Sequence, residues 1–282
     1  MGVFNFTGNS LYDVSFDSGG SSLDEAYDVM DEALYADPFD ITVMSFNVMW
    51  FKGINSHLDL MQSIISEYDP DVIGLQEFQE YDKDTTPELA TELLSEDYPY
   101  MEMGMYGNKN AIASKIHLLD FVTIPHHIQT IEGQSYSIAT IVISGKKIYF
   151  VVAHLTTSTH EWAKVEQAEE LCNVLKTLPR FILMADMNTT CKSKSDPEYT
   201  TIMEQYINAG FNIYNCSDQN GFTDTWTDGR TFEDVWYPCD NIITSPNITI
   251  NDTAIDYQKI PFAQEHQSIV DHVPIIAYVT VS

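Results

Sequence analysis

Basic residues are scarce in this sequence. Its 282 residues include 42 Asp and Glu but only 13 Lys and Arg, which gives a formal net charge of −29 at pH 7. Such a surface repels nucleic acids and anionic membranes unless cations or a local basic patch intervene. The composition therefore argues against tight, non-specific DNA binding, but it leaves room for weak, metal-assisted contact with a phosphodiester.

Long apolar runs are also missing. No run approaches the roughly 18 to 20 residues that a membrane-spanning helix needs, so no membrane span is expected. Residues 1–10 carry neither a basic residue nor an apolar core segment, so no secretory signal is predicted and we expect a cytoplasmic protein. A mature secreted form, from which a signal had been removed, would show the same pattern.

Paired cysteines are absent as well. The four cysteines lie far apart in the sequence and none belongs to a Cys-x-x-Cys pair, so a zinc site has little support. We interpret them as buried free thiols in a reducing compartment. They are Cys172, Cys191, Cys216 and Cys239.

The composition changes near Pro38. Residues 1–51 contain no Lys, Arg or His, whereas acidic residues recur throughout the same stretch. We interpret residues 1–38 as an acidic N-terminal appendage and residues 39–282 as the main domain. Hydrophobic residues make up 44% of the chain, which is typical of a well-packed globular protein.

Two local patterns stand out in the N-terminal appendage. Gly8-Asn9-Ser10 lies between two apolar runs and predicts a hairpin. Ser22 and Glu25 have the spacing of a capping box, which predicts a helix from about Leu23 to Tyr35. The apolar side of this helix could dock onto the main domain, or it could bind a protein partner or a second copy of the chain. Both alternatives are open at this point.

In the main domain, short apolar runs alternate with helical patterns. Five runs predict strands, at Ile41–Val48, Asp71–Leu75, Ile148–Ala153, Phe181–Ala185 and Ile275–Val281. Three segments predict helices, at His57–Tyr68, Glu161–Leu178 and Glu198–Ala209. In the second of these, the apolar side is predicted to comprise Trp162, Val165, Ala168, Leu171, Cys172 and Leu175. Strands with interleaved helices indicate the α/β class.

Four of the predicted strands lead directly into a polar side chain. These side chains are Asn47, Glu77, His154 and Asp186, and Asn188 follows the last of them. A lone Asp or Asn after a strand is usually a turn residue, whereas Glu and His are less common there. Four such endings, together with the Asp271-His272 pair before the last strand, predict a shared site at one rim of the sheets.

The residue types at these positions suit the hydrolysis of a phosphate ester. Carboxylate and amide oxygens are the hard ligands that Mg²⁺ and Mn²⁺ prefer. Such a metal polarises a phosphoryl oxygen, and a carboxylate–imidazole pair can activate the attacking water.

The motifs along the main domain resemble those of the endonuclease/exonuclease/phosphatase superfamily, the group that includes pancreatic-type deoxyribonuclease. In family order they are Ser45-Phe-Asn47-Val, Asp71-Val-Ile-Gly-Leu-Gln-Glu77, Asn110-Ala-Ile-Ala-Ser-Lys115, Ala153-His154-Leu, Asp186-Met-Asn188, Cys239-Asp240-Asn-Ile-Ile-Thr-Ser245 and Val270-Asp271-His272-Val-Pro274. Together they cover about residues 41–280. The resemblance implies that residues 39–282 form a catalytic domain with a four-layered α/β sandwich, in which two mixed β-sheets pack face to face with helices outside.

The resemblance also implies a metal site. Glu77 would be the principal ligand of Mg²⁺ or Mn²⁺, and Asn47 and Asp271 would lie near the metal.

The remaining motif positions would be catalytic. His272 would be the general base, oriented by Asp240. Asp186 and Asn188 would position water, the phosphate or a second metal, and His154 would contact the phosphate.

The substrate is open at this stage. The first hypothesis is a nuclease or other phosphodiesterase that acts on nucleic acid. The second is an enzyme for a small nucleotide, an inositol phosphate or a phospholipid headgroup. The third is a catalytically idle scaffold, against which the intact set of motif residues argues.

Several side chains are candidates for substrate contact. Those for the phosphate are Lys52, Lys109, Asn110 and Arg230, although solvated surface charge explains the three cations equally well. The aromatic residues Trp226, Phe232, Trp236 and Tyr237 could stack on a base, line a headgroup pocket or belong to the core.

Overall fold

The structure is a computed structural model. It describes residues 37–48, 58–78, 94, 97–104, 109–130, 133–157, 161–189, 195–214, 216–217, 221–222, 226–227, 236–237, 239–254 and 272–282. The chain divides into two compact units, of which one comprises Met1–Asp37 with Ile143–Lys146 and the other Pro38–Val142 with Lys147–Ser282. The hairpin and helix predicted for the N-terminal appendage lie outside the described residues.

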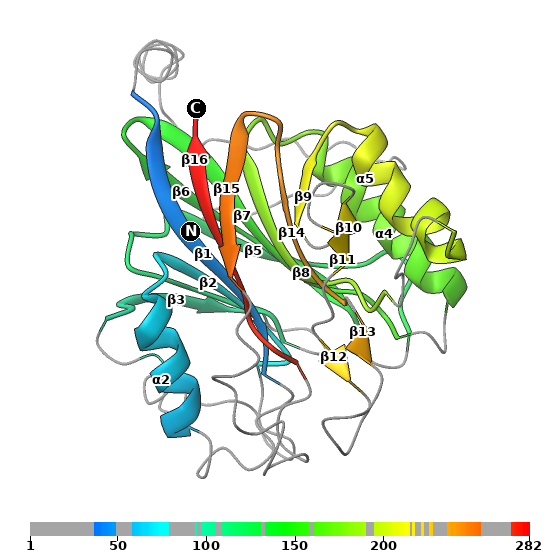
Figure 1. Cartoon of the computed structure of the whole chain (residues 1–282), viewed down its shortest axis with the longest axis horizontal. Coiled ribbons are helices and arrows are strands. Elements are labelled where there is room, and N and C mark those ends of the chain that lie inside the picture. Colours follow the sequence, from blue (N-terminus) through cyan, green and yellow to red (C-terminus); the bar gives the residue numbers. More distant parts are fainter. Residues whose placement is uncertain are drawn as a thin grey trace. The chain divides into compact units, whose positions relative to one another are not determined.

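The first of two large sheets has the strand order β15-β16-β1-β2-β4-β3 (Figure 1). Its strands are β1 (Phe39–Asn47), β2 (Val72–Gln76), β3 (Tyr100–Met103), β4 (Ala111–Ser114), β15 (Ile248–Ala254) and β16 (Ile275–Val281). β1 and β2 run parallel, and the other neighbouring pairs are antiparallel. The sheet is therefore mixed, as predicted.

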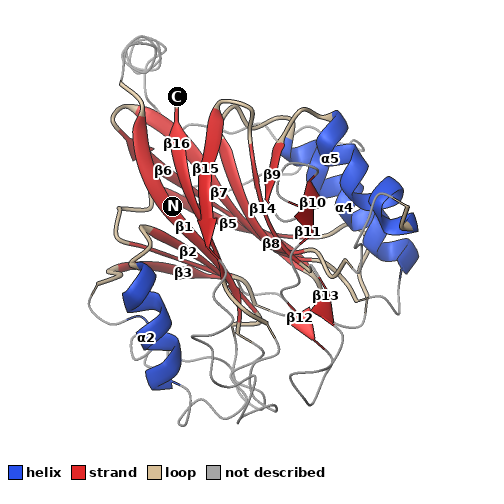
Figure 2. Ribbon diagram, in the orientation of Figure 1, coloured by secondary structure: helices blue, strands red, loops and turns tan. Residues whose placement is uncertain are grey.

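The second sheet has the order β5-β6-β7-β8-β14-β9 (Figure 2). Its strands are β5 (Asp120–Pro125), β6 (Ser135–Ile143), β7 (Lys146–His154), β8 (Phe181–Asp186), β9 (Asn212–Tyr214) and β14 (Asp240–Thr244). β7 and β8 are parallel, whereas β14 is antiparallel to both β8 and β9. Two short antiparallel pairs accompany it: β10 (Cys216–Ser217) with β11 (Gly221–Phe222), and β12 (Trp226–Thr227) with β13 (Trp236–Tyr237).

Helix α2 (Leu58–Tyr68) covers the outer face of the first sheet. Ile64 and Ile65 of this helix are buried in one cluster with Phe46 and Leu75 of β1 and β2. Because successive side chains of a strand point to opposite faces, the alternate residues of β1 and β2 face the second sheet. The same alternation places Asn47 on that inner face.

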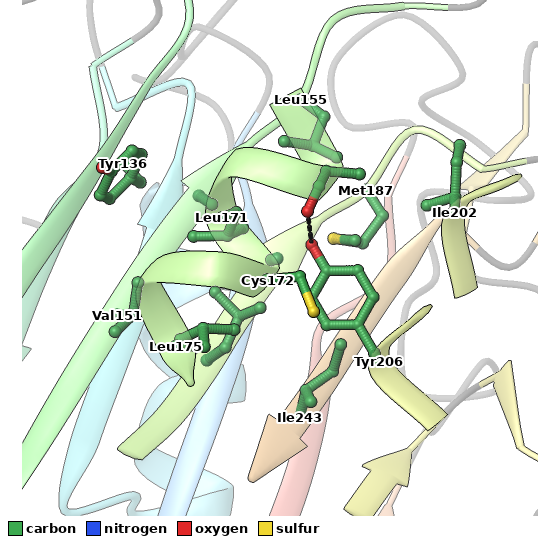
Figure 3. Packing of buried hydrophobic residues seen from close by; sticks show 14 of the residues in the cluster. Tyr136, Val151, Leu155, Leu171, Cys172, Leu175, Met187, Ile202, Tyr206 and Ile243 are labelled. Atoms are coloured by element: carbon green, nitrogen blue, oxygen red, sulfur yellow. Dashed lines mark hydrogen bonds between the residues drawn. The ribbon is translucent and has the colours of Figure 1, made fainter. Parts of the chain in front are cut away.

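The second sheet is covered by α4 (Glu161–Leu175), the π-helical turn η4 (Tyr199–Met203) and α5 (Glu204–Asn208). Figure 3 shows how Leu171 and Leu175 of α4 lie against Val151 of β7. Tyr206 of α5 is fully buried, and its hydroxyl donates to the backbone carbonyl of Ala168 at 2.8 Å. Burial of each large apolar side chain contributes about 1.5–3 kcal/mol, so this layer fixes α4 firmly on the sheet.

The two sheets pack face to face, and Gly74 of β2 lies where they come very close. A Cβ atom at this position would lie only 2.8 Å from Met184 Cβ and 2.8 Å from Val152 Cγ2 of the second sheet. Gln76 lies two residues after Gly74 on β2. Its side-chain amide donates to Ser45 Oγ at 3.1 Å and to the Met184 carbonyl at 3.2 Å. The order of layers is therefore helix, sheet, sheet, helix, which confirms the predicted four-layered sandwich.

All five predicted strands are present, within two residues at each end. The three predicted helices are also present, although the third is a π-helical turn followed by one α-helical turn. One expectation for α4 is wrong: Trp162 is 62% exposed rather than part of the apolar side. The buried side instead includes Lys164 and Gln167, which make hydrogen bonds inside the protein.

The cysteine and membrane expectations can be compared with part of the chain only. Cys172 and Cys239 are free and buried, while the side chains of the other two cysteines lie outside the described residues. In the described part of the chain, no helix combines the length and apolar character that crossing a bilayer requires.

Candidate active site

The strands of the second sheet bring three candidate residues into one row. His154 at the end of β7 is paired in register with Asp186 at the end of β8, and Asp186 is paired with Asp240 at the start of β14. Residues in register on adjacent strands point to the same face of a sheet. Here that face is the inner one, so the three side chains meet at the rim of the sandwich.

Asp186 lies at the centre of the site and is almost completely buried. Its Oδ2 accepts a hydrogen bond from the Asn47 amide at 2.9 Å, and its Oδ1 accepts one from the backbone N–H of Asn188 at 2.8 Å. Two imidazoles flank the same carboxylate, with His154 Nε2 at 3.5 Å and His272 Nε2 at 3.6 Å from Oδ2. Residues from both sheets therefore converge on one carboxylate.

The surroundings of Asp186 favour its ionised form. Burial by itself would raise the pKa of this carboxyl group, but the imidazoles of His272 and His154, the Asn47 amide and the Asn188 backbone N–H outweigh burial, so its pKa lies below the ordinary value. The site therefore keeps a buried negative charge.

His272 and Asp240 form a buried pair. His272 Nδ1 lies 2.8 Å from Asp240 Oδ2, and the exposed fractions of the two residues are 4% and 1%. A carboxylate at Nδ1 favours the tautomer with a proton on that nitrogen, which leaves the lone pair on Nε2. That nitrogen is the one on the Asp186 side, so the pair has the arrangement of a general base with its orienting carboxylate.

His154 is held by Asn188. The Asn188 amide nitrogen lies 2.9 Å from His154 Nε2 and donates to the backbone carbonyl of Leu155 at 2.8 Å. Asn188 has a φ of 49°, a left-handed conformation that Asn tolerates better than most residues. The short loop after β8 thus folds back onto the end of β7.

Glu77 follows β2 with a φ of 55°. A non-glycine residue in this region is uncommon, and Asn, Asp and His are the ones that favour it. Glu77 Oε1 lies 3.3 Å from the Asn47 amide nitrogen and 3.8 Å from His154 Nε2, and its side chain is 19% exposed. Glu77 is therefore the most accessible of the clustered carboxylates. It lies beside Asn47 of the first sheet and His154 of the second.

The donor set fits a hard divalent cation. Ligand atoms of Asp186, Asp240 and His272 all lie within 4.8 Å of one another. The Asn47 amide also bridges the carboxylates of Asp186 and Glu77, so three carboxylates share a confined region with two imidazoles. Carboxylate oxygens and an imidazole are groups that bind divalent metal ions, so the cluster could hold one.

Two described candidates, Asn110 and Lys109, make hydrogen bonds to residues outside this cluster. Asn110 is fully buried, and its amide donates to the backbone carbonyl of Ser135 at 2.8 Å. Lys109 is buried as well, and its carbonyl accepts a hydrogen bond from the Phe78 backbone. Lys52, Arg230 and Asp271 lie outside the described residues, as do the side chains of the aromatic candidates.

Two residues that support the site were not predicted from the sequence. Lys164 of α4 is fully buried and donates to the backbone carbonyl of Asn188 at 2.8 Å. Gln167 accepts a hydrogen bond from the backbone N–H of Thr156, two residues beyond His154, at 2.9 Å. The available signal was their helical spacing with Ala168 and Leu171, which places two polar residues on a buried face.

Residues 44–257 match the endonuclease/exonuclease/phosphatase family, and this match covers most of the chain. The chain therefore belongs to that family of phosphoesterases. A comparison with curated proteins gave no match.

Solved structures share the fold. D. rerio TDP2 complexed with a single-strand DNA product has 18% identity, covers 85% of this chain and 98% of its own, and gives a TM-score of 0.64. The human Nocturnin catalytic domain with bound sulfate has 16% identity, coverage of 88% and 98%, and a TM-score of 0.62. ANGEL2, a 2′,3′-cyclic phosphatase, in complex with adenosine-2′,3′-vanadate has 17% identity, coverage of 86% and 96%, and a TM-score of 0.64. At these identities the likeness establishes the fold.

Proposed function

We propose that the chain is a divalent-metal-dependent hydrolase that cleaves phosphodiester bonds of nucleic acid by attack of a His-activated water. The observation that carries the proposal is the His272–Asp240 pair, whose second imidazole nitrogen faces the Asp186 carboxylate. A base oriented in this way can take a proton from a water molecule held beside it.

The residues divide into three roles. Glu77 and Asn47, together with Asp271, would hold Mg²⁺ or Mn²⁺, which would supply Lewis-acid stabilisation of the phosphoryl oxygens. His272 Nε2 takes the proton of the attacking water, and Asp240 stabilises the imidazolium that results. As the water oxygen bonds to phosphorus, the ester P–O bond breaks and the leaving oxygen takes up a proton from solvent, to which the His272 imidazolium then releases its own.

The remaining side chains contact the phosphate region. We propose that Asp186 and Asn188 orient the water or the phosphate, and that His154, held by Asn188, contacts a phosphate oxygen. Lys52, Asn110 and Arg230 are further proposed contacts, of which Asn110 would act from its buried position. The intact set of clustered groups supports an enzyme over an idle scaffold.

A small substrate is the second candidate, favoured by the charge of −29. An acidic protein meets less repulsion from a nucleotide, an inositol phosphate or a phospholipid headgroup than from a polyanion. Neighbours of both kinds share the fold, since one is described with a single-strand DNA product and another as a 2′,3′-cyclic phosphatase.

A substrate panel with Mg²⁺ and Mn²⁺ decides between these candidates. It comprises plasmid DNA, single-stranded DNA, RNA, nucleotides, inositol phosphates and sphingomyelin, each also incubated with His272→Ala. Turnover of a nucleic acid by the wild type and not by the variant supports the first candidate. Turnover of small esters alone favours the second, and no turnover of any ester contradicts both.

For residues 1–38 we propose a separate acidic element that docks on the catalytic domain or binds a protein partner. The proposal rests on the predicted amphipathic helix at about Leu23 to Tyr35. Deletion of residues 1–38 separates the two roles: a lower melting temperature with unchanged oligomeric state supports docking, and loss of assembly with an unchanged melting temperature supports partner binding.

A further inference from the structure

The first turns of α4 carry two buried polar side chains that point at the loops of the site. Lys164 and Gln167 are both fully buried and lie three residues apart, on the same side of the helix. Lys164 contacts the loop after β8, and Gln167 contacts the segment after β7. A single helical turn thus touches the two segments that leave His154 and Asp186.

The Lys164 contact continues to the imidazole of His154. Lys164 Nζ forms a buried ion pair with Glu198 and donates to the Asn188 carbonyl at 2.8 Å. The amide of the same Asn188 lies 2.9 Å from His154 Nε2 and donates to the Leu155 carbonyl at 2.8 Å. A shift of the Asn188 backbone would therefore displace the group that orients the His154 ring.

Gln167 makes the second contact from α4. Its side-chain oxygen accepts from the Thr156 backbone N–H at 2.9 Å, and its amide donates to the Ile128 carbonyl at 2.9 Å. Thr156 lies two residues after His154, so Gln167 fixes the chain that follows His154. Thr156 is itself fully buried, as expected of an anchored segment.

Stability alone is a poor explanation for Lys164. Replacing a buried ion pair by apolar residues of similar volume is often neutral or stabilising, because removing two charges from water is costly. The rest of the buried face of α4 is mainly apolar, with Ala168, Leu171 and Leu175 in the core. A lysine is needed here only if its ammonium group must reach something, and what it reaches is the Asn188 carbonyl and Glu198.

We propose that Lys164, supported by Glu198 and Gln167, is a positioning residue that sets the Asn188 amide against the His154 ring. As a statement about turnover, this inference rests on the proposed phosphoesterase function. As a statement about the His154 ring, it stands on the hydrogen bonds alone.

Two variants separate positioning from folding. Lys164→Met removes the ammonium group that faces the buried Glu198 carboxylate, and we expect the melting temperature to fall by roughly 10 °C. The double variant Lys164→Met/Glu198→Gln removes both charges of the pair, so most of the melting temperature returns. The Asn188 carbonyl still lacks its donor, and we expect kcat to remain on the order of 10- to 100-fold below wild type with KM nearly unchanged.

Leu175→Ala provides the matched control. It lies on the same helix, is fully buried and loses core packing, whereas the hydrogen bonds from α4 to the two loops described above come from Lys164 and Gln167. Below its own melting temperature this control should keep the wild-type kcat. Gln167→Met examines the second contact with the same readouts, and a smaller loss of kcat is expected because Lys164 is retained.

NMR of the His154 imidazole provides a readout that does not need activity. Its signals, assigned with His154→Gln, should move in the double variant and stay in place in Leu175→Ala. An unmoved His154 ring in the double variant overturns the inference, whatever the turnover. If the wild type hydrolyses no phosphate ester, the proposed function fails, and the ring signals still decide whether Lys164 positions His154.

Discussion

The two sheets support their parts of the site in different ways. Behind the second sheet, α4 uses Lys164 and Gln167 to hold the loops that follow the strands through hydrogen bonds. Behind the first sheet, Ile64 and Ile65 of α2 pack in an apolar cluster with strand residues such as Phe46 and Leu75. At the rim, His154 and Asp186 of the second sheet are almost completely buried, whereas Glu77 of the first sheet is partly exposed.

This difference matches the proposed division of labour. An imidazole that takes or gives a proton must keep its angle, whereas a metal ligand at the mouth of a site can adjust as the ion and its waters enter. The comparison predicts different outcomes when each side is altered.

The largest effect is expected on the first sheet. Glu77→Gln keeps the shape of the side chain but weakens a hard-metal site, so turnover should fall by several orders of magnitude. Chelation with EDTA should lower the turnover of the wild type in the same way, and added Mg²⁺ or Mn²⁺ should restore that turnover. Glu67→Gln on the exposed side of α2 makes the same charge change away from the site and should leave turnover intact. Full hydrolysis in excess EDTA would contradict the metal mechanism.

The next effect concerns the pair that joins the sheets, since Asp240 opens β14 and His272 precedes β16. We expect His272→Ala to lower kcat by on the order of 10²- to 10⁴-fold, and the double variant with Asp240→Ala to be no worse than His272→Ala. Steady-state kinetics of His272→Ala, Asp240→Ala and the double variant form the test, with exposed His117→Ala as control. Losses that multiply in the double variant would show that the two residues act independently.

A moderate effect is expected where the sheets touch. Gly74→Ala places a Cβ atom against Met184 and Val152, and such overpacking destabilises by about 1–3 kcal/mol. Because the added methyl group separates the sheets below the site, kcat should fall as well. Gly210→Ala is the comparison, since its φ is 79° but a Cβ there would meet open space. It should lower stability by about 1 kcal/mol through backbone strain alone and leave kcat unchanged.

The smallest effect is expected from salt. The chain has few Lys and Arg, so few counterions are displaced when a nucleic acid binds, and log K should fall only gently with log salt. Binding to single-stranded DNA measured between low and physiological salt checks this. A slope on the order of six or more would reveal a basic groove supplied by one of the sheets or its loops.

The elements that carry the site were predictable because their patterns are local. The apolar runs before Asn47, His154 and Asp186 are strands, and the resemblance of their endings to family motifs gave the fold and the clustered residues. β6 was not among the predicted strands, although its residues alternate in part between polar and apolar.

Other features depend on contacts between distant segments. Hydrophobicity predicts that Trp162 is buried and Lys164 exposed, whereas in the structure Lys164 is buried and Trp162 exposed. The buried interactions of Lys164 with Asn188 and Glu198 outweigh the apolar pattern of α4. Asn110 is a second example, because this candidate for phosphate contact donates a hydrogen bond to the Ser135 carbonyl. The spacing of polar and apolar residues in the sequence does not identify the hydrogen-bond partners of Lys164 or Asn110.

The backbone at Glu77 has a consequence for how stable the protein can be. A glutamate with a φ of 55° is strained, and residues held in this region cost about 1–3 kcal/mol each. Glycine adopts the same conformation freely and would also remove one carboxylate from a crowded negative site. An inactive Glu77→Gly chain is therefore expected to withstand heat or urea better than the wild type does. Under the proposed function, catalysis and stability make opposite demands on this position.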